Sequence, residues 1–452
     1  MSTTDKISAV LESESIPKLL WKFALPAVIG TMVNALYNVV DRIFIGHGVG
    51  SLAISGLAVT FPILIFLQAM GMLIGAGAAT RISILLGQKR RDEAEKLLGN
   101  AFLLTLLVSG SATFLCVLFL EPLLLAFGAS EQTLPYAYDY LMIVLPGNVC
   151  ANIAFSYNAV MRASGYPTRA MFTMLVGAVS NIILDAVFIF GLDMGIKGAA
   201  WATAYSMFLC MCFVLSHYRR KDSNLQLLVS NMRMRKDYTI AILSIGMAPF
   251  IMQLTSSAIA VIINTGLLRY GGDLAVGAYG ILNSFVMIIF MFFLGISQGM
   301  QPIVGYNYGA HLYKRVKEAT WIAMYLNMGI GLIGGAMALF FPEFIVAAFT
   351  KDPELASITV SAIRICTFHF ALVGFQVTIT QYFQSTGYAR SSIFLSLTRQ
   401  VLYLIPLLFL LPTLWGLKGI WWSLPISDIL SSFTAFAMYW IHYKKELLPH
   451  FS

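Results

Sequence analysis

The chain has 452 residues, of which 58% are hydrophobic and 11% are charged. That composition leaves too little polar surface to coat a water-soluble domain of this size, so it predicts an integral membrane protein. The formal net charge of +8 is spread over the loops and forms no long basic block, which excludes nucleic acid as a partner.

Mainly apolar runs of about 20 residues, enough to cross roughly 30 Å of hydrocarbon as a helix, recur along the whole chain. In the first half they lie near 19–45, 53–80, 97–120, 133–160, 169–191 and 198–216. In the second half they lie near 238–266, 275–305, 319–341, 355–384, 391–412 and 417–442. The runs lack the alternating polarity of barrel strands. We therefore predict an all-α integral membrane protein with twelve transmembrane helices.

Lysine and arginine gather on one side of the predicted membrane. The opposite side carries only five of them: Arg42, Lys197, Arg269, Lys351 and Lys418. By the positive-inside rule, both termini are expected in the cytoplasm of a multi-pass protein of the cell (inner) membrane. The first 16 residues are polar and lack the apolar core of a secretory signal, so the first span is expected to be retained.

The sequence contains two copies of one pattern. Ala163-Ser164-Gly165-Tyr166 returns 222 positions later as Ser385-Thr386-Gly387-Tyr388, and Gly195-Ile196-Lys197-Gly198 returns 221 positions later as Gly416-Leu417-Lys418-Gly419. Pro26 matches Pro249 in the first span of each copy, and a proline inside a membrane helix permits bending. We predict two pseudo-symmetric six-helix bundles: an N-terminal lobe (1–216), a cytoplasmic linker (217–237) and a C-terminal lobe (238–452).

The two copies differ in charge. Asp41 of the first copy faces Asn264 in the second, and Asp185 faces Leu407. On the first span, Asp41 shares one helix face with three other polar residues, because they are spaced three and four apart: Asn34, Tyr37 and Asn38. On the fifth span, Asn181 lies one turn before Asp185. Function is expected in the lobe that holds both acids.

Depth along the helices brings these groups together. Counting about 1.5 Å per residue, Asp41 lies roughly 33 Å from the cytoplasmic start of its span, Asp185 roughly 24 Å from Arg169, and Thr203 about 8 Å from the outer surface. All three belong to the outer half of the membrane. Carboxylate, amide and hydroxyl oxygens can coordinate a hard cation such as Na⁺, and protons compete for carboxylates in apolar surroundings. The competing interpretation is that Asp41 caps its helix or pairs with Arg42.

One pair of charged residues within spans is predicted to be structural. Arg399 and Asp428 reach a similar depth in the last two spans and are expected to pair. Arg364 has no evident partner in the sequence, and Asp139 is interfacial. The cysteines and histidines form no cluster, and neither a nucleophile elbow nor a phosphate-binding loop appears, so we predict that the protein is not an enzyme and needs no cofactor.

An ordered set of motifs resembles the multidrug and toxic compound extrusion (MATE) transporters. The motifs are the run from Pro26 through Asp41-Arg42-Ile43-Phe44-Ile45-Gly46, the Arg162-Ala163-Ser164-Gly165 turn, Asn181-Ile182-Ile183-Leu184-Asp185 and the element from Gly195 to Ala202. The resemblance covers essentially the whole chain and is strongest to the prokaryotic DinF-like branch.

The resemblance implies a monomeric, two-lobed antiporter with a central cleft, in which H⁺ and/or Na⁺ entry drives export of amphiphilic or cationic small molecules. It implies a coupling site formed by Asp41, Asn181, Asp185 and Thr203, which are also the residues that would hold Na⁺. Tyr37, Tyr140 and Asn158 match supporting polar residues, with Asn34 beside them. Spans seven and ten contain no acid, unlike other branches, so coupling through the second lobe is not expected.

One alternative within the same superfamily is a flippase for lipid-linked oligosaccharides or lipids. A flippase would be expected to bind pyrophosphate with several arginines or lysines inside its cavity. Only Arg364 and Arg399 lie well within spans, and Arg399 has a predicted partner. The sequence therefore favours ion-coupled export.

Overall fold

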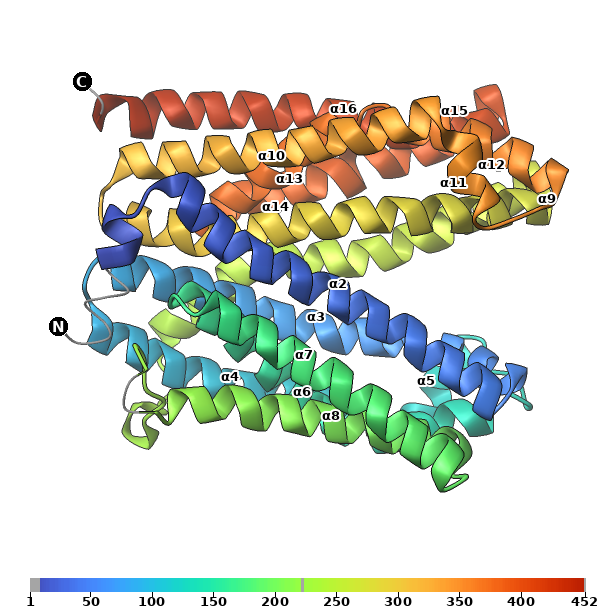
Figure 1. The fold of residues 1–452 in the computed structure, drawn as a ribbon, viewed down its shortest axis with the longest axis horizontal. Coiled ribbons are helices and arrows are strands. Elements are labelled where there is room, and N and C mark those ends of the chain that lie inside the picture. Colours follow the sequence, from blue (N-terminus) through green and yellow to red (C-terminus); the bar gives the residue numbers. More distant parts are fainter. Residues whose placement is uncertain (1–8, 221–222, 451–452) are drawn as a thin grey trace. The chain divides into compact units, whose positions relative to one another are not determined.

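The computed structural model describes residues 9–220 and 223–450, and helices are the only regular elements in these ranges (Figure 1). The first repeat contains α2 (Ile16–Gly48), α3 (Ser51–Gly87), α4 (Arg91–Leu118), α5 (Leu120–Ala126), α6 (Leu134–Ala163), α7 (Pro167–Asp185), η1 (Ala186–Gly191) and α8 (Gly195–Tyr218). The short η2 (Val229–Asn231) lies in the connection between repeats.

The second repeat begins with α9 (Lys236–Gly309), a 74-residue helix, and continues with α10 (Tyr313–Phe340). It then contains α11 (Pro342–Ala347), α12 (Pro353–Thr367), α13 (Phe370–Ser385), α14 (Ala389–Leu397), η3 (Thr398–Leu404), α15 (Ile405–Trp415), α16 (Leu417–His442), η4 (Tyr443–Leu447) and η5 (Leu448–His450). The all-helical fold class is thus confirmed.

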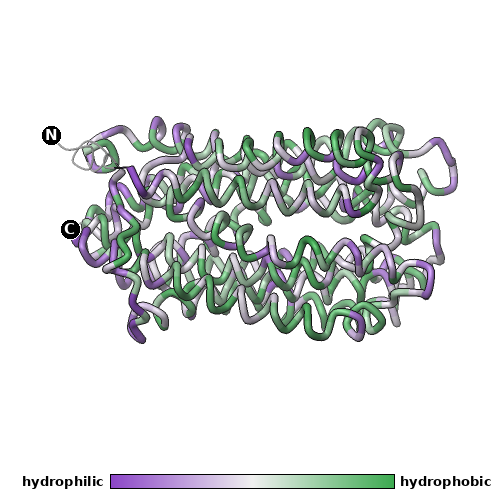
Figure 2. The backbone as a smooth tube through the Cα atoms, turned by 90° about the horizontal axis from the view of Figure 1, so that it is seen from below, coloured by the Kyte–Doolittle hydropathy of each residue, from purple (hydrophilic) through white to green (hydrophobic). Residues whose placement is uncertain are grey.

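Ten of the described helices are long and apolar enough to cross a membrane, and the bent pair α12 and α13 forms an eleventh span. Gly272 interrupts α9 with φ 66° and ψ −166°, so this helix accounts for two of the predicted spans. The described helices therefore accommodate all twelve. Hydrophilic residues lie mostly at loops and helix ends, while the helix interiors are mainly hydrophobic (Figure 2).

Backbone geometry at the repeated turns agrees with the duplication. Gly165 and Gly387 both have left-handed φ values, 99° and 83°, and Gly195 and Gly416 have φ values of 58° and 57°. A side chain is strained in this region, so glycine is the residue that each turn requires. The same backbone solution occurs at equivalent positions in both copies.

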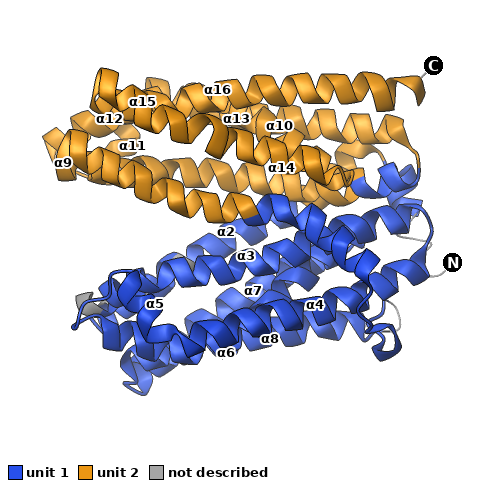
Figure 3. Cartoon of the chain, turned by 180° about the vertical axis from the view of Figure 1, so that it is seen from behind, with its two compact units in different colours: residues 1–14, 25–250, 305–310 blue, residues 15–24, 251–304, 311–452 orange. Residues whose placement is uncertain are grey.

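The chain folds into two compact units (Figure 3). Unit 1 comprises 1–14, 25–250 and 305–310, and unit 2 comprises 15–24, 251–304 and 311–452. Two helices have residues in both units. Helix α2 passes from unit 2 to unit 1 after residue 24, and α9 passes from unit 1 to unit 2 after residue 250 and returns to unit 1 at residue 305. The crossings after residues 24 and 250 lie beside the matched prolines Pro26 and Pro249. The first part of α2 and the first part of α9 are therefore each packed in the unit that holds most of the other repeat.

Glycines allow this packing. In unit 1, a Cβ on Gly246 of α9 would lie 1.6 Å from the carbonyl oxygen of Leu73 on α3. In unit 2, a Cβ on Gly299 would lie 2.5 Å from the Cα of Ala24. Ala24 and Gly246 are 222 positions apart, and Leu73 and Gly299 are 226 apart, one helical turn more than the repeat offset, so the two contacts join corresponding helices of the two repeats. Helix backbones approach this closely in membranes where small residues line the contact.

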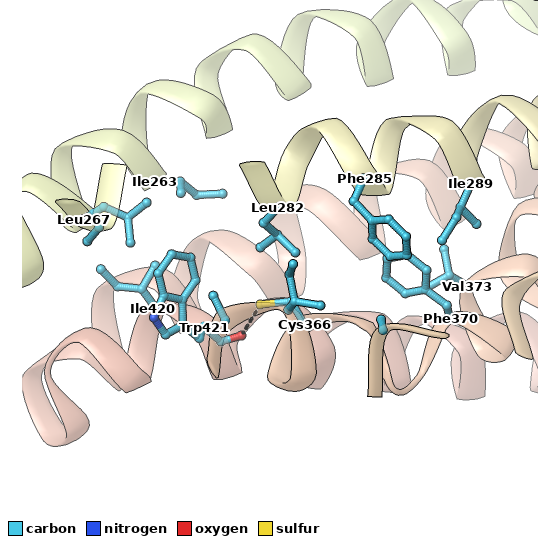
Figure 4. Close-up of a cluster of buried hydrophobic side chains, with 14 of the residues drawn as sticks. Ile263, Leu267, Leu282, Phe285, Ile289, Cys366, Phe370, Val373, Ile420 and Trp421 are labelled. Atoms are coloured by element: carbon cyan, nitrogen blue, oxygen red, sulfur yellow. Dashed lines mark hydrogen bonds between the residues drawn. The ribbon is translucent and has the colours of Figure 1, made fainter. Parts of the chain in front are cut away.

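Each unit has a hydrophobic core and a buried polar clamp. The core of unit 2 includes Leu282, Phe285, Phe370 and Trp421 (Figure 4). In unit 1, the Asn152 amide of α6 donates to Ser109 Oγ (2.8 Å) on α4 and to the Leu67 carbonyl (3.1 Å) on α3. The clamp recurs in unit 2 with the asparagine on a different helix.

In unit 2 the clamp residue is Asn327 of α10, which donates to Ser297 Oγ (3.2 Å) and Thr378 Oγ1 (2.9 Å). Side-chain hydrogen bonds of this kind connect three helices where apolar contact alone gives little specificity in a membrane.

We expect Asn152→Ala to lower thermal stability, because it leaves the buried Ser109 hydroxyl and Leu67 carbonyl without their donor. The cost is about 1–3 kcal/mol. Thermal unfolding of purified protein in detergent measures the effect. Ser111→Ala is the control, since the Ser111 hydroxyl is exposed and bonds only within its own helix. Equal stability of Asn152→Ala and Ser111→Ala would contradict a role for the clamp.

Candidate functional site

Four helices of unit 1 carry the predicted polar site. Asp41 and Tyr37 lie one turn apart on α2, and Asp185 is the last residue of α7. The π-helical segment η1 follows Asp185 directly, and such segments often occur at functional sites. Thr203 lies on α8 and Tyr140 on α6.

Close helix packing draws α2 against α7 and η1. A Cβ on Gly30 of α2 would lie 2.5 Å from the sulfur of Met174, and one on Gly48 would lie 2.2 Å from a methyl carbon of Ile189. On α2, Asp41 lies between Gly30 and Gly48. In the sequence, Asp185 lies between Met174 and Ile189, the residues that these two glycines approach. The small residues therefore hold the two acids at one level.

The two carboxyl groups lie close enough to interact electrostatically. Tyr37 interacts electrostatically with both acids, and Tyr140 interacts with both acids and with Tyr37. Thr203 lies beside Tyr140. The structure thus brings together five predicted residues from four helices, as the depth argument required.

Several buried polar atoms at this site have no hydrogen-bond partner among the described residues. They are Asp41 Oδ1, both carboxylate oxygens of Asp185, and both side-chain polar atoms of Asn181. Asp185 has no exposed surface, and Asn181 is 1% exposed. A proton or a cation would satisfy these oxygens, whereas leaving them bare is costly.

Neither acid forms an ion pair with a lysine or arginine in the described part of the chain. Arg42 attracts Asp41 electrostatically, but its guanidinium lies 4.7 Å from the centre of the Phe61 ring. The alternative of an Asp41–Arg42 pair is therefore wrong. Oxygen ligands such as these fit a hard cation, and no cluster of three or more His, Cys, Asp or Glu is found in the described ranges.

Two predicted supporting residues differ from this arrangement. The Asn158 amide donates to the Ala170 carbonyl (2.6 Å), and its oxygen accepts from Arg162. Asn158 lies about 27 Å from Tyr140 along α6, so it belongs to the opposite end of the helix. Asn34 has an exposed side chain on α2. The side chain of Asn38 lies outside the described part of the structure.

Cys210 is a neighbour of the site that sequence reasoning missed. It interacts electrostatically with Tyr37, and its thiol donates to the Thr173 carbonyl (3.4 Å). Cys210 lies seven residues after Thr203 on α8 and therefore shares its helix face. That spacing was the available signal, but a lone cysteine in an apolar run resembles an ordinary packing residue.

The other charged residues that the sequence singled out within or near spans have partners. Arg399 Nε donates to Asp428 Oδ1 (2.7 Å), which confirms the predicted pair. Arg364 pairs with Glu343 (2.9 Å), a partner that the sequence did not reveal, and Asp139 pairs with Lys197 (3.3 Å).

Comparison with known proteins places the chain in a family. The MatE family model matches residues 26–187 and 249–410, one segment in each repeat. The multidrug export protein MepA of Staphylococcus haemolyticus is 29% identical, over 94% of this chain and 93% of its own length. MepA of Staphylococcus aureus is 28% identical over the same shares.

Solved structures agree with the sequence matches. A structure of the MATE multidrug transporter DinF-BH is 38% identical, with a TM-score of 0.88 and coverage of 96% of this chain and 97% of that chain. An outward-facing multidrug resistance MATE family transporter has the same fold at 22% identity, with a TM-score of 0.90 and coverage of 97% and 98%. Both matching segments, the two-lobed helical fold and these relatives lead to one conclusion: the chain belongs to the MatE family of membrane transporters.

Proposed function

We propose that this protein is a secondary active exporter of amphiphilic or cationic compounds, driven by exchange for H⁺ and/or Na⁺. The observation that carries the proposal is the Asp41–Asp185 pair, a half-buried and a buried carboxyl group that lie close enough to interact and whose buried oxygens have no hydrogen-bond partner in the described ranges. The names of the MepA and DinF-BH relatives support drugs as the exported class. We also propose that the protein acts as a monomer in the cell membrane, with both termini in the cytoplasm.

The site residues have distinct roles in this proposal. Asp41 and Asp185 bind the incoming cation, and the Asn181 amide oxygen and the Thr203 hydroxyl complete the ligands when that cation is Na⁺. The Tyr37 and Tyr140 hydroxyls lie beside the carboxyls and can hydrogen-bond to the charged form. Neutralising Asp41 changes the free energy of burying its carboxyl group, and therefore the preferred position of α2. Pro26 inside α2 gives this helix a place to bend.

Binding energy at the acid pair can drive transport only if it differs between two conformations of the protein. A buried, uncompensated carboxyl pair meets this condition because the strength of ion binding depends on how closely α2 and α7 hold the two acids together. Drug and cation need not share a pocket. They need only favour different positions of the same helices.

No observation favours the flippase alternative. The two arginines that lie well within the spans, Arg364 and Arg399, are both paired with acids. A pyrophosphate group would have to displace Glu343 or Asp428 to reach either of them. The paired arginines therefore weigh against a site for a lipid-linked pyrophosphate.

Purified protein in liposomes tests the proposal. We expect an inward-directed pH or Na⁺ gradient, imposed with zero membrane potential, to drive export of ethidium against its own gradient in vesicles of the matching orientation. Gradients of K⁺ serve as the control for osmotic and counter-ion effects. Equal ethidium movement with every gradient and with none would contradict coupled transport, whichever drug the protein prefers.

A further inference from the structure

The second unit contains a buried charged cluster at a break in a helix. Helices α12 and α13 meet at an angle of 50°, and His369 is in the short connection between them. Its side chain is 1% exposed. The Nε2 atom of His369 lies 2.8 Å from Asp428 Oδ2 on α16, and its Nδ1 atom has no hydrogen-bond partner in the described ranges.

Asp428 has a second partner. Arg399 Nε donates to the other carboxylate oxygen of Asp428, and the Arg399 guanidinium lies 5.2 Å from the centre of the Phe290 ring. Arg399 is in the π-helical segment η3. The other unit has a similar arrangement, because Asp185 directly precedes the π-helical segment η1. The side chain of Arg399 is 22% exposed, against 12% for Asp428. Arg399 is therefore the member of the cluster that can leave it most easily.

The surroundings of His369 offer no second acid among the described residues. On α12, Cys366 lies beside Asp428, and its thiol donates to the Trp421 carbonyl (3.5 Å), a contact drawn in Figure 4. Tyr279 of α9 interacts with Cys366. The facing helix α10 approaches this level with Gly331 and Gly335, which pack against the Phe370 and Thr367 carbonyls. The charged or titratable groups facing the cluster are thus Asp428, Arg399, Cys366 and Tyr279.

The Asp428 carboxylate interacts with two basic residues, His369 and Arg399. With His369 neutral, its Nε2–H donates to Asp428, and the ion pair of Asp428 with Arg399 leaves the cluster without net charge. With His369 protonated, two cations share a single carboxylate in a buried site. Their mutual repulsion is weakly screened there and opposes keeping both cations on Asp428.

We propose that His369 is a proton-binding site of unit 2, and that a proton bound there displaces Arg399 from Asp428. The displaced guanidinium is then free to bind an anionic or polar group. The adjacent residue Gln400 reaches an exposed position, where it donates to Ser256 (2.8 Å). The inference does not rest on the acid pair of unit 1. It assigns an ion-responsive element to the repeat in which the sequence predicts no coupling acid.

Histidine NMR tests the site directly. The protein has six histidines, so ring-labelled histidine gives few signals, and His369→Gln identifies the one from His369. Glutamine retains a donor for Asp428 and cannot titrate. We expect the His369 ring signal to change when the pH is lowered from about 8 to 5, because proton binding places a charge on the imidazole.

Arginine modification tests the displacement. Phenylglyoxal labelling of Arg399, measured by mass spectrometry, is divided by labelling of Arg269, an exposed arginine of the same unit. This ratio cancels the intrinsic effect of pH on the reagent. We expect the ratio to rise as the pH falls over the same range in the wild type and to stay constant in His369→Gln.

A His369 signal that does not change over this pH range would overturn the proposal, as would a ratio that rises equally in His369→Gln. If His369→Gln does not fold, the pH dependence of the labelling ratio in the wild type still decides. Both readouts are made without a transport assay, so failure of the proposed export function would leave them unaffected.

Discussion

Asp185→Asn and Asp41→Asn should each abolish gradient-driven export while leaving a folded protein. Asparagine has nearly the same shape as aspartate, so packing is retained, but it cannot take up a proton at physiological pH and it removes one charge from the cation site. Loss of one charge-assisted contact worth about 1.4 kcal/mol already lowers cation affinity tenfold. We expect the rate of coupled ethidium transport to fall by about tenfold or more.

Asp139→Asn is the matched control for these variants. Asp139 is an acid of the same unit, but its side chain is 41% exposed and it pairs with Lys197 at 3.3 Å. Its replacement should leave transport close to the wild-type rate. The same liposome assay, with protein amount and folded fraction equalised by size-exclusion chromatography, compares the three variants. Coupled transport that persists in both Asp41→Asn and Asp185→Asn would show that the cation binds elsewhere.

Gly246→Ala should strongly destabilise the protein, although alanine is the better helix former. A Cβ at this position would lie 1.6 Å from a backbone oxygen of α3, and a backbone atom cannot move aside without separating the two helices. Overpacking of this kind costs about 3 kcal/mol. The expected result is a large drop in the temperature at which the detergent-solubilised protein loses its monodisperse peak.

Gly280→Ala gives a control with the opposite sign. Gly280 belongs to the same helix, and a Cβ there would meet nothing within 4 Å. Because glycine in a helix costs roughly 0.5–1 kcal/mol relative to alanine, this variant should be unchanged or slightly more stable. A similar response of Gly246→Ala and Gly280→Ala would mean that the close approach of α9 to α3 is not tight in solution.

Much of the fold could be predicted from the sequence because membrane spans leave a strong signal. Each span must satisfy its own backbone, so apolar length identifies it. The break of α9 at Gly272 falls between the predicted runs 238–266 and 275–305. The bend before His369 falls inside the run 355–384, which was predicted as one span. The exchange of the helix starts between units was not predicted, because it depends on backbone contacts at Gly246 and Gly299 that no periodicity marks.

The acid pair could be predicted by depth because charged residues in spans are few. The same counting placed Arg399 beside Asp428. It did not find His369, since a single histidine in an apolar run has no spacing pattern and a bent span shifts the depth of every residue after the bend. Asn158 shows the limit of resemblance, because a matching residue type does not reveal which end of a helix it serves. The amide oxygen of Asn158 instead accepts a hydrogen bond from Arg162, one helical turn later.

The placement of residues 15–24 and 238–250 has a consequence for the protein's ancestry. If each repeat lends its opening segment to the opposite bundle, a half-length precursor encoding one repeat could not complete its own bundle as a single chain. Two precursor molecules would instead have associated reciprocally, each donating its leading helix to its twin. Gene fusion would then have made a pre-existing partnership permanent, and the separated halves of the present protein should still find each other when they are produced together.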